Sequence, residues 1–231
     1  MHPDLSRNRT SMYAFTNSYI CVRLLSRQPE IAMREDSKAE RHAEIEKAAY
    51  ELLRTKGYGG TSMLSIAKLA KASNETLYRW YGDKNGLFKT MVDSNARTTK
   101  EALQAAIRDG TDPVAALRHV APILLSMLLG QQAISLNRAA AADESGELGR
   151  AIAAGGRDSV FPLIETLMRR GQESGALATP SASTATEWFL SLLIGDLQIR
   201  RINRTLPLLS DADVRARASA AIDAFRKLCA G

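Results

Sequence analysis

The segment of residues 61–88, TSMLSIAKLAKASNETLYRWYGDKNGLF, constrains the fold more than any other part of the chain. Its pattern predicts two short helices, Ser62 to Ala70 and Asn74 to Tyr81, joined by a tight turn. Thr61 and Ser73 are suited to cap them, because hydroxyl oxygens accept hydrogen bonds from the free N–H groups of a first helical turn. A glycine then stops the second helix. The segment therefore predicts a helix-turn-helix.

The second of these helices has two unlike faces. Leu77 and Tyr81 supply its apolar inward side. The outward side offers hydrogen bonds and positive charge at Asn74, Thr76, Tyr78 and Arg79. Such a face can enter the major groove of DNA while the first helix lies across the backbone. Thr61 and Lys84 stand at helix N-termini, whose N–H groups favour phosphate.

Helical periodicity continues through the rest of the chain. Apolar residues recur at three- and four-residue spacing, as at Ile45, Ala48 and Leu52. There is no sign of strand pairs, so the predicted fold class is all-α. A three-helix N-terminal domain is expected at residues 38–84 and a larger helical domain at 85–231. Helices are predicted over residues 38–56, 84–108, 113–129, 131–143, 145–154, 158–174, 182–204 and 211–229.

The first 37 residues lack a steady period and are predicted to form a disordered extension. Their apolar piece, residues 19–22, is too short for a signal peptide and is followed by Arg23. Met33 opens a charged helical stretch, so it is an alternative start of the native protein. No apolar run approaches the roughly 18 residues that a membrane span needs, and no membrane partner is expected.

The positive charge is concentrated in the N-terminal part of the chain. The whole chain has 31 Lys and Arg against 25 Asp and Glu. Residues 34–90 hold 11 basic against 8 acidic residues, whereas residues 91–231 hold 16 against 15. A basic module beside a near-neutral one favours a polyanion partner. Cys21 and Cys229 fit no metal or disulfide motif, which indicates a reducing cytoplasm.

Residues 45–88 resemble the DNA-binding domain of the tetracycline-repressor (TetR) family. The matching residues, in the family's order and spacing, are Ile45 through Ala49, Gly57-Tyr58, Thr61-Ser62-Met63, Ile66-Ala67, Ala70, Ser73, Thr76-Leu77-Tyr78, Lys84 and Leu87-Phe88. The resemblance implies an all-α homodimer whose two heads read two half-sites of a near-palindromic operator in double-stranded DNA. It also implies a transcriptional repressor that a small apolar or amphipathic effector releases from DNA.

The resemblance assigns roles to individual residues. It places Thr76, Tyr78 and Lys84 on phosphates, and Trp80 beside the backbone. Asn74, Glu75 and Arg79 match the more variable positions near base edges. The full set of expected DNA-binding residues is Thr61, Ser62, Lys71, Ser73, Asn74, Glu75, Thr76, Tyr78, Arg79, Trp80 and Lys84.

Two residues depart from the family pattern. Lys71 occupies a turn position at which glycine is usual, and a left-handed backbone there would cost about 1 kcal/mol. Glu75 stands where a small or basic residue is common. Its carboxylate could accept a hydrogen bond from cytosine N4, or it could stabilise the N-terminus of its own helix. The operator sequence therefore does not follow from the resemblance.

Residues 121–201 resemble, more loosely, the AcrR/AefR-like C-terminal domain, with Arg138-Ala139-Ala140 as the best local match. This implies a ligand pocket and a dimer interface. Helices 182–204 and 211–229 are expected to form the interface, with packing inside one chain as the alternative. The expected ligand-binding residues are Asn95, Met127, Gln131, Phe161, Met168 and Trp188, each of which could instead be plain core or, for the two amides, an exposed position.

Enzyme activity has little support in the sequence. His42 and His119 stand in no nucleophile motif, and Asp143 with Glu144 has no His or Cys nearby in sequence. No cofactor, metal or catalytic residue is predicted. The alternative function is a helical small-molecule-binding protein without DNA-binding activity. Arg200, Arg201 and Arg204 form either an anion site or, more commonly, a solvated face.

Overall fold

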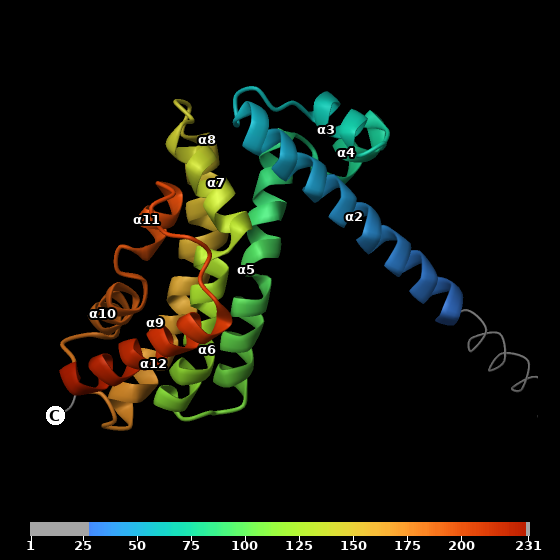
Figure 1. Ribbon diagram of the computed structural model, residues 1–231. Helices are drawn as coiled ribbons and strands as arrows, with labels where there is room; N and C mark the ends of the chain where they lie inside the picture. The colour runs from blue at the N-terminus through green and yellow to red at the C-terminus, as the bar shows by residue number, and fades with distance from the viewer. Residues whose placement is uncertain (1–27, 230–231) are drawn as a thin grey trace, which may run out of the picture. The chain divides into compact units, whose positions relative to one another are not determined.

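The computed structural model describes residues 28–229, with side chains from residue 37 onward. Every regular element in that range is a helix, which confirms the all-α prediction. In chain order (Figure 1) they are α2 (Gln28–Lys56), α3 (Met63–Leu69), α4 (Asn74–Tyr81), α5 (Lys84–Arg108), α6 (Pro113–Leu129), α7 (Gln131–Ala141), α8 (Glu147–Ile152), the π-helix η1 (Ala153–Arg157), α9 (Asp158–Glu173), α10 (Ala182–Ile194), α11 (Leu197–Ile202) and α12 (Asp211–Leu228).

By its internal contacts the chain divides into two units, residues 1–45 and 46–231. The predictions for residues 1–27 lie outside the described residues. Helix α2 begins at Gln28, ten residues before the predicted start. Pro29 is tolerated there because the first turn of a helix has no hydrogen-bond partner for its N–H groups. No glycine or further proline follows before residue 38 to stop a helix.

The turn between α2 and α3 differs from the prediction at its cap. Gly57 leaves α2 with a φ of 69°, a conformation that glycine adopts without steric cost. Ser62, rather than Thr61, is the N-cap of α3: its hydroxyl accepts from the Ser65 N–H at 3.2 Å. Thr61 is buried and donates its hydroxyl to the Gly57 carbonyl at 2.7 Å. The capping position therefore falls to the next hydroxyl along the chain.

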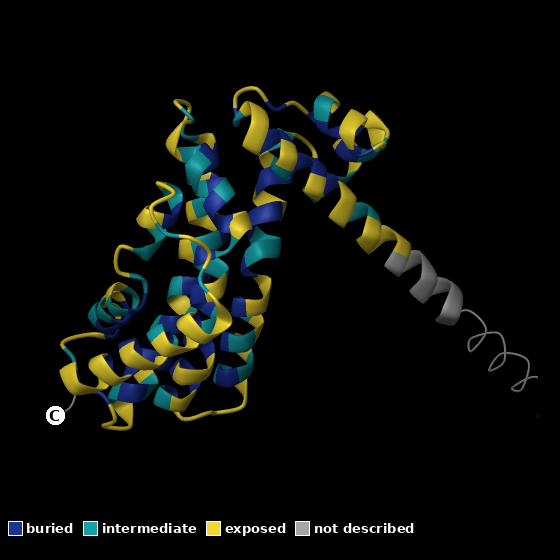
Figure 2. Cartoon of the chain, viewed as in Figure 1, coloured by how far each residue is buried: buried dark blue, intermediate teal, exposed yellow. Residues whose placement is uncertain are grey.

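The larger helical part is organised around the long helix α5. This helix packs against α6 and α9, and α12 packs against α6 and α10. Within the core, the rings of Phe189 and Phe225 meet edge to face with centroids 5.9 Å apart. Buried residues lie mainly on the helix faces that turn toward neighbouring helices (Figure 2). The 25 residues of α5 thus lead from the helix-turn-helix directly into this core.

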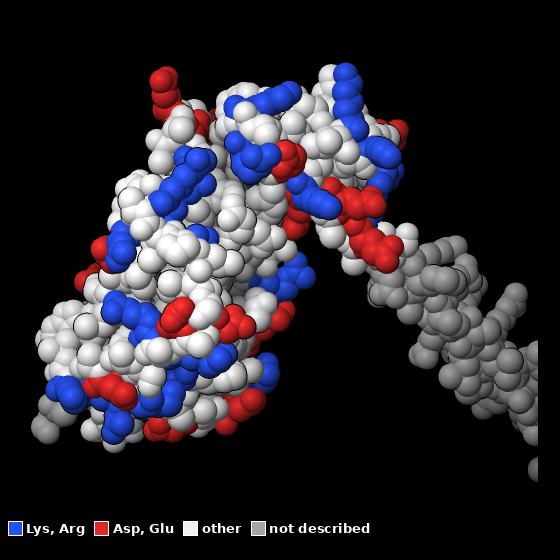
Figure 3. All heavy atoms as spheres, viewed as in Figure 1, with Lys and Arg blue, Asp and Glu red and all other residues white. Residues whose placement is uncertain are grey.

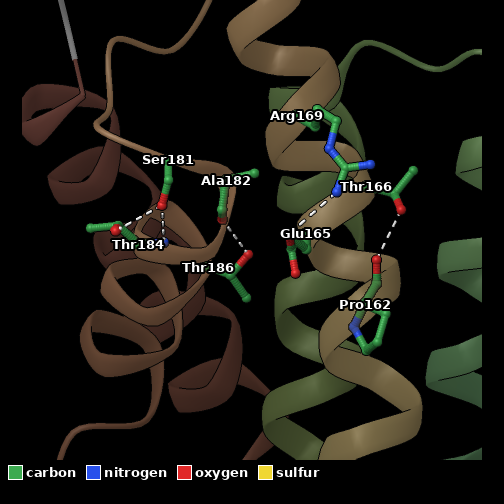
Figure 4. Close-up of polar contacts among 8 residues, drawn as sticks. All are labelled: Pro162, Glu165, Thr166, Arg169, Ser181, Ala182, Thr184 and Thr186. Carbon is green, nitrogen blue, oxygen red and sulfur yellow. Dashed lines mark hydrogen bonds and ion pairs between the residues drawn. The ribbon is translucent and has the colours of Figure 1, made fainter.

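Side-chain hydroxyls organise the ends and turns of the later helices (Figure 4). Ser181 caps α10, because its hydroxyl accepts from the Thr184 N–H at 3.0 Å. Pro162 lies inside α9, and its carbonyl accepts from the Thr166 hydroxyl at 2.9 Å. Neither contact requires a distant partner, so both belong to the locally encoded part of the fold.

Arginine side chains, by contrast, bind the C-terminal ends of helices far away in the sequence. The last carbonyls of a helix have no donor within it, and a cation beside them also interacts favourably with the helix dipole. The four donors are Arg170 at the end of α5 (2.6 Å), Arg201 at α6 (3.1 Å), Arg217 at α10 (2.6 Å) and Arg138 at α11 (3.0 Å). These contacts fix where one helix ends against another.

Arg201 is the most buried of these arginines, with 8% of its surface exposed. Its guanidinium donates to the carbonyls of Leu129 at 3.1 Å and Leu206 at 3.4 Å. The predicted anion site or solvated face is therefore wrong for this residue, whereas Arg200 and Arg204 are exposed. Periodicity could not reveal this, because the acceptors come from other parts of the chain.

The predicted helix at residues 182–204 is two helices. Gly195, with φ 51° and ψ −132°, separates α10 from α11. An L-residue rarely adopts this conformation, so the glycine makes the break possible. The predicted helix at 145–154 is likewise shorter, because the chain passes from α8 into the π-turn of η1.

Within residues 28–229, no single helix is both long and apolar enough to span a membrane. The bent pair α6 and α7, 50° apart, meets the length and composition test only when the two are taken together.

Candidate nucleic-acid interface and effector cavity

Helix α4 has the two faces that its sequence predicts. Leu77 and Tyr81 are 0% and 7% exposed, which confirms them as its inward side. Tyr78 is 50% exposed although it is aromatic. Its exposed neighbours are Asn74, Glu75 and Arg79, while Thr76 is partly exposed. Basic side chains lie over α3 and α4, with acidic side chains beside them (Figure 3). This face has no part in the core.

Local caps fix both ends of α4. The Ser73 hydroxyl accepts from the Thr76 N–H at 3.0 Å and lies 2.8 Å from the Thr76 hydroxyl. Gly82, at φ 77°, ends the helix. Asp83 then caps α5 by accepting from the Gly86 N–H at 2.8 Å. Because the caps follow one another without a gap, α4 is held at a fixed direction to the first turn of α5.

Lys71 lies in the turn before α4 with a φ of 51°. The turn therefore has the left-handed backbone for which glycine is usual at this position. An L-residue in this region carries a steric cost that glycine does not. Lys71 is exposed, so its side chain offers the turn no burial in return.

We expect Lys71→Gly to raise the free energy of unfolding by about 0.5–1 kcal/mol, because glycine removes the left-handed penalty. Urea denaturation measures the change. Ala70→Gly is the comparison: Ala70 has φ −78° and is buried, so glycine there adds chain entropy to the unfolded state, removes a buried methyl group and should destabilise. A loss of stability in both variants would show that the turn at Lys71 is unstrained.

Lys84 is held against the turn that follows α2. Its ammonium donates to the Tyr58 carbonyl at 3.1 Å and lies 3.8 Å above the centre of the Tyr58 ring. The ring also meets Phe88 edge to face at 5.2 Å. A predicted phosphate contact by Lys84 would therefore start from an ammonium that the protein already positions.

The Tyr58 hydroxyl connects the same turn to α8. It donates to Glu147 Oε2 at 3.2 Å. Burial raises the pKa of Tyr58 to about 12, and the Glu147 carboxylate adds to the rise. The phenol therefore stays protonated and able to donate at neutral pH. Sequence reasoning missed this contact, since 89 residues separate its partners.

The remaining predicted DNA-binding residues differ in exposure. Ser62 is exposed at the start of α3. Trp80 is partly buried, with its ring 6.4 Å from that of Tyr81. Thr61 is 2% exposed, so its side chain faces the interior rather than the outward face of α4. The structure thus places Ser73, Asn74, Glu75, Thr76, Tyr78 and Arg79 at least partly exposed on α4 and its cap, whereas Thr61 is buried.

A cavity of about 540 Å³ lies among the C-terminal helices. This volume is within the range of small-molecule sites. α5, α6, α7, α9 and α10 supply mainly apolar walls, including Leu124, Phe161 and Ile164. Small residues of α8 and η1, Gly149 and Gly156 among them, leave room on one side. The cavity therefore suits a mostly apolar molecule.

Three of the six predicted ligand-binding residues line this cavity: Asn95, Met127 and Phe161. Gln131 does not; it is exposed and donates to the Ser135 hydroxyl at 3.3 Å. Met168 is fully buried in the hydrophobic core, and Trp188 is partly buried and packs against that core. Packing therefore takes up these two side chains, as the alternative reading of each allowed.

Sequence reasoning also missed cavity residues, of which Arg157 matters most because it is the charged one. In the sequence, a charged residue beside glycines resembles a solvent-exposed position. The π-helical backbone of η1 also interrupts the α-helical spacing from which residues on one face are recognised. Among the described residues, no group of three or more His, Cys, Asp or Glu side chains has the arrangement of a metal site.

Comparison with known proteins agrees with this architecture. Residues 45–91 match the pattern described as bacterial regulatory proteins of the tetR family, and residues 115–228 match the AefR-like transcriptional repressor C-terminal domain. The HTH-type transcriptional regulator HbdR of Aromatoleum sp. (strain CIB) is 32% identical over 80 residues. That match spans 35% of this chain and 35% of HbdR.

Solved structures match over a greater length. A TetR-family regulator of Mesorhizobium loti has a TM-score of 0.66 at 25% identity, covering 84% of this chain and 98% of that one. A TetR regulator of Agrobacterium tumefaciens has a TM-score of 0.61 at 26% identity, covering 81% and 93%. Fold and outward helix face define a helix-turn-helix transcriptional regulator. The chain belongs to the TetR family of bacterial regulators.

Proposed function

We propose that this chain is a cytoplasmic, homodimeric repressor whose α4 helices read a near-palindromic operator and which a small effector releases from DNA. The outward face of α4 is the observation that carries this proposal. Ser73 caps the helix at the end that faces a groove in a helix-turn-helix, and Tyr78 stays exposed although it is aromatic. A helix with no binding role would gain by burying that ring.

The roles within this face follow from chemistry. The hydroxyls of Thr76 and Tyr78 and the ammonium of Lys84 are donors suited to phosphate oxygens, which set position but carry no base sequence. Asn74 and Arg79 can donate to base edges. For Glu75, exposed in the first turn of α4, stabilisation of the helix N-terminus and acceptance from cytosine both stay open.

A gel-shift titration on the promoter beside the chain's own gene tests the proposal. We expect a discrete complex that weakens as salt rises, because phosphate neutralisation releases counterions. A scrambled duplex of the same length and composition is the control. Equal affinity for the two duplexes, or no complex, would favour the alternative of a small-molecule-binding protein without DNA activity.

Dimerisation through α10 and α12 is supported by the outer face of α12. Ile222 and Phe225 of α12 are buried in the chain's own core. The opposite face carries four exposed alanines at four-residue spacing: Ala212, Ala216, Ala220 and Ala224. Small residues in such a row let a second helix approach closely. This face is the surface that a partner's helix would cover.

We expect Ala220→Arg to weaken the dimer by about 100-fold, because a cation would be buried without a partner. Sedimentation at several concentrations measures the dissociation constant. Ala220→Ser keeps the side chain small and should leave the dimer intact. If Ala220→Arg dimerised as well as the unchanged chain, the interface would lie elsewhere.

Effector response requires a path from the cavity to the head, and α8 offers one. Its N-terminal residue Glu147 accepts from Tyr58, and the same helix supplies Gly149 and Ile152 to the cavity wall. η1 packs closely against α5 at Gly155: a Cβ atom added to this glycine would lie only 2.8 Å from Val92 Cγ1. A ligand that binds better in one arrangement of α8 and η1 would shift the population of DNA-binding heads.

A further inference from the structure

We propose that the cavity binds a small monocarboxylate with an apolar body, and that Arg157 receives its carboxylate. The inference deepens the proposed function and rests on it in one respect, the identification of the bound molecule as the effector. The binding itself depends only on the groups that line the cavity.

The residues that line the cavity carry positive charge and no negative charge. Arg157 is the charged residue among the 22 that line the cavity, and no Asp or Glu is among them. No hydrogen bond or ion pair occupies its guanidinium within the described part of the chain. An anion at this rim would therefore gain a counter-charge without displacing an existing one.

Apart from Arg157, the polar side chains of the cavity are neutral amides and a hydroxyl, which can donate or accept. The side-chain amides of Asn137 and Gln198 donate hydrogen bonds to the backbone carbonyls of Ala133 and Leu128, at 2.9 and 3.0 Å. Asn95 and Ser191 make no side-chain hydrogen bond among the residues described. With Arg157, they leave amide, hydroxyl and guanidinium donors for a ligand. The guanidinium, which donates only and carries positive charge, favours an anionic acceptor over a cation, and the neutral groups can add donors to it.

The position of Arg157 is set by its neighbours. Its guanidinium carbon lies 5.3 Å from the centre of the Phe161 ring, and a cation over an aromatic face is attracted to it. Phe161 itself lines the cavity. Arg157 is exposed, which places the charge at the mouth and the apolar walls behind it. A carboxylate held at the mouth would direct its hydrocarbon body inward.

The π-turn of η1 supplies the geometry. Within η1, Ala153, Gly156 and Arg157 all line the cavity. The spacing i, i+3 and i+4 puts these positions on one face of a helical turn, and π-turns are frequent at functional sites. One short segment thus supplies both the side chain that binds the carboxylate and part of the space for the apolar part of the ligand.

Calorimetric titration with dodecanoate and with methyl dodecanoate tests the proposal. The two differ in charge but share a body. We expect dodecanoate to bind about tenfold tighter, as expected for one charge-assisted contact at a partly exposed site. 4-Phenylbutyrate and its methyl ester form a second pair that allows for a different body shape. If neither acid bound better than its ester, the proposal would be overturned.

Single substitutions test whether Arg157 binds the carboxylate. Arg157→Gln should remove the acid's advantage and leave ester binding unchanged. Arg150→Gln is the matched control, since Arg150 is exposed and does not line the cavity; it should keep the advantage. An advantage that survives Arg157→Gln would contradict the assignment of the carboxylate to Arg157.

A gel shift with the same ligands separates the two proposals. Tight carboxylate binding without release of DNA would support the site and contradict its role as the effector site. Release of DNA by an ester as readily as by its acid would support effector control while overturning the carboxylate assignment.

Discussion

Thr76→Ala combined with Tyr78→Ala is expected to abolish detectable operator binding while the protein stays folded. A hydrogen bond to a charged group is worth about 1.5–3 kcal/mol, so two lost phosphate contacts weaken one head by at least about 100-fold. A dimer with two additive heads would lose about 10,000-fold. Fluorescence anisotropy with a labelled operator measures the change.

The design of this variant separates binding from folding. Tyr78 is half exposed and Thr76 partly so, and neither belongs to the core of α4. Circular dichroism should therefore show the same helicity and nearly the same Tm. Thr166→Ala, which removes a hydroxyl from α9, is the control and should leave the affinity unchanged.

Salt dependence sharpens the interpretation. The hydroxyls of Thr76 and Tyr78 are neutral, so their loss should lower affinity without changing the slope of log affinity against log salt. Lys84→Ala should reduce that slope by about one phosphate per head. A double variant that kept its affinity would show that this face does not contact DNA.

Arg201→Ala is expected to destabilise the chain by about 3 kcal/mol. The change leaves the carbonyls of Leu129 and Leu206 without their buried donor, and a buried unsatisfied acceptor costs about 1–3 kcal/mol. It also removes the packed stem of a side chain that is only 8% exposed. For a chain of this size the Tm should fall by about 10 °C.

The neighbouring residue provides the control. Arg200 is exposed, and its nearest carboxylate, Asp196, lies 3.9 Å away. Surface pairs of this kind contribute about 0–1 kcal/mol, so Arg200→Ala should unfold almost as the unchanged chain does. Equal losses from the two variants, measured by thermal unfolding, would show that the contacts of Arg201 add nothing to stability.

The sequence was a good guide wherever the information is local. Helix α5 was predicted at its observed bounds because its apolar residues keep one period from Leu87 to Ala106. Helix α4 was predicted because a serine cap and a glycine stop lie on either side of it. These signals depend on residues within one or two helical turns, so the local sequence is enough to predict the helix.

Predictions failed where distant parts of the chain decide the outcome. Arg201 looked like a surface cation, since its carbonyl partners belong to another helix and to a later loop. Gly195 stood in a strongly apolar run, where a glycine can be tolerated or can break a helix, and tertiary packing chose the break. The cavity combines short pieces of α5 through α11, so single-helix patterns found Asn95, Met127 and Phe161 but not Arg157.

Dimethyl sulfate protection on the operator tests the central claim most directly. The reagent methylates guanine N7 in the major groove and adenine N3 in the minor groove, and these atoms report on the two grooves separately. If α4 enters the major groove, guanine N7 atoms should be protected in two half-sites while adenine N3 atoms stay reactive, and the Thr76→Ala/Tyr78→Ala variant should protect neither. Protection confined to adenine N3, or unchanged in the variant, would contradict the account.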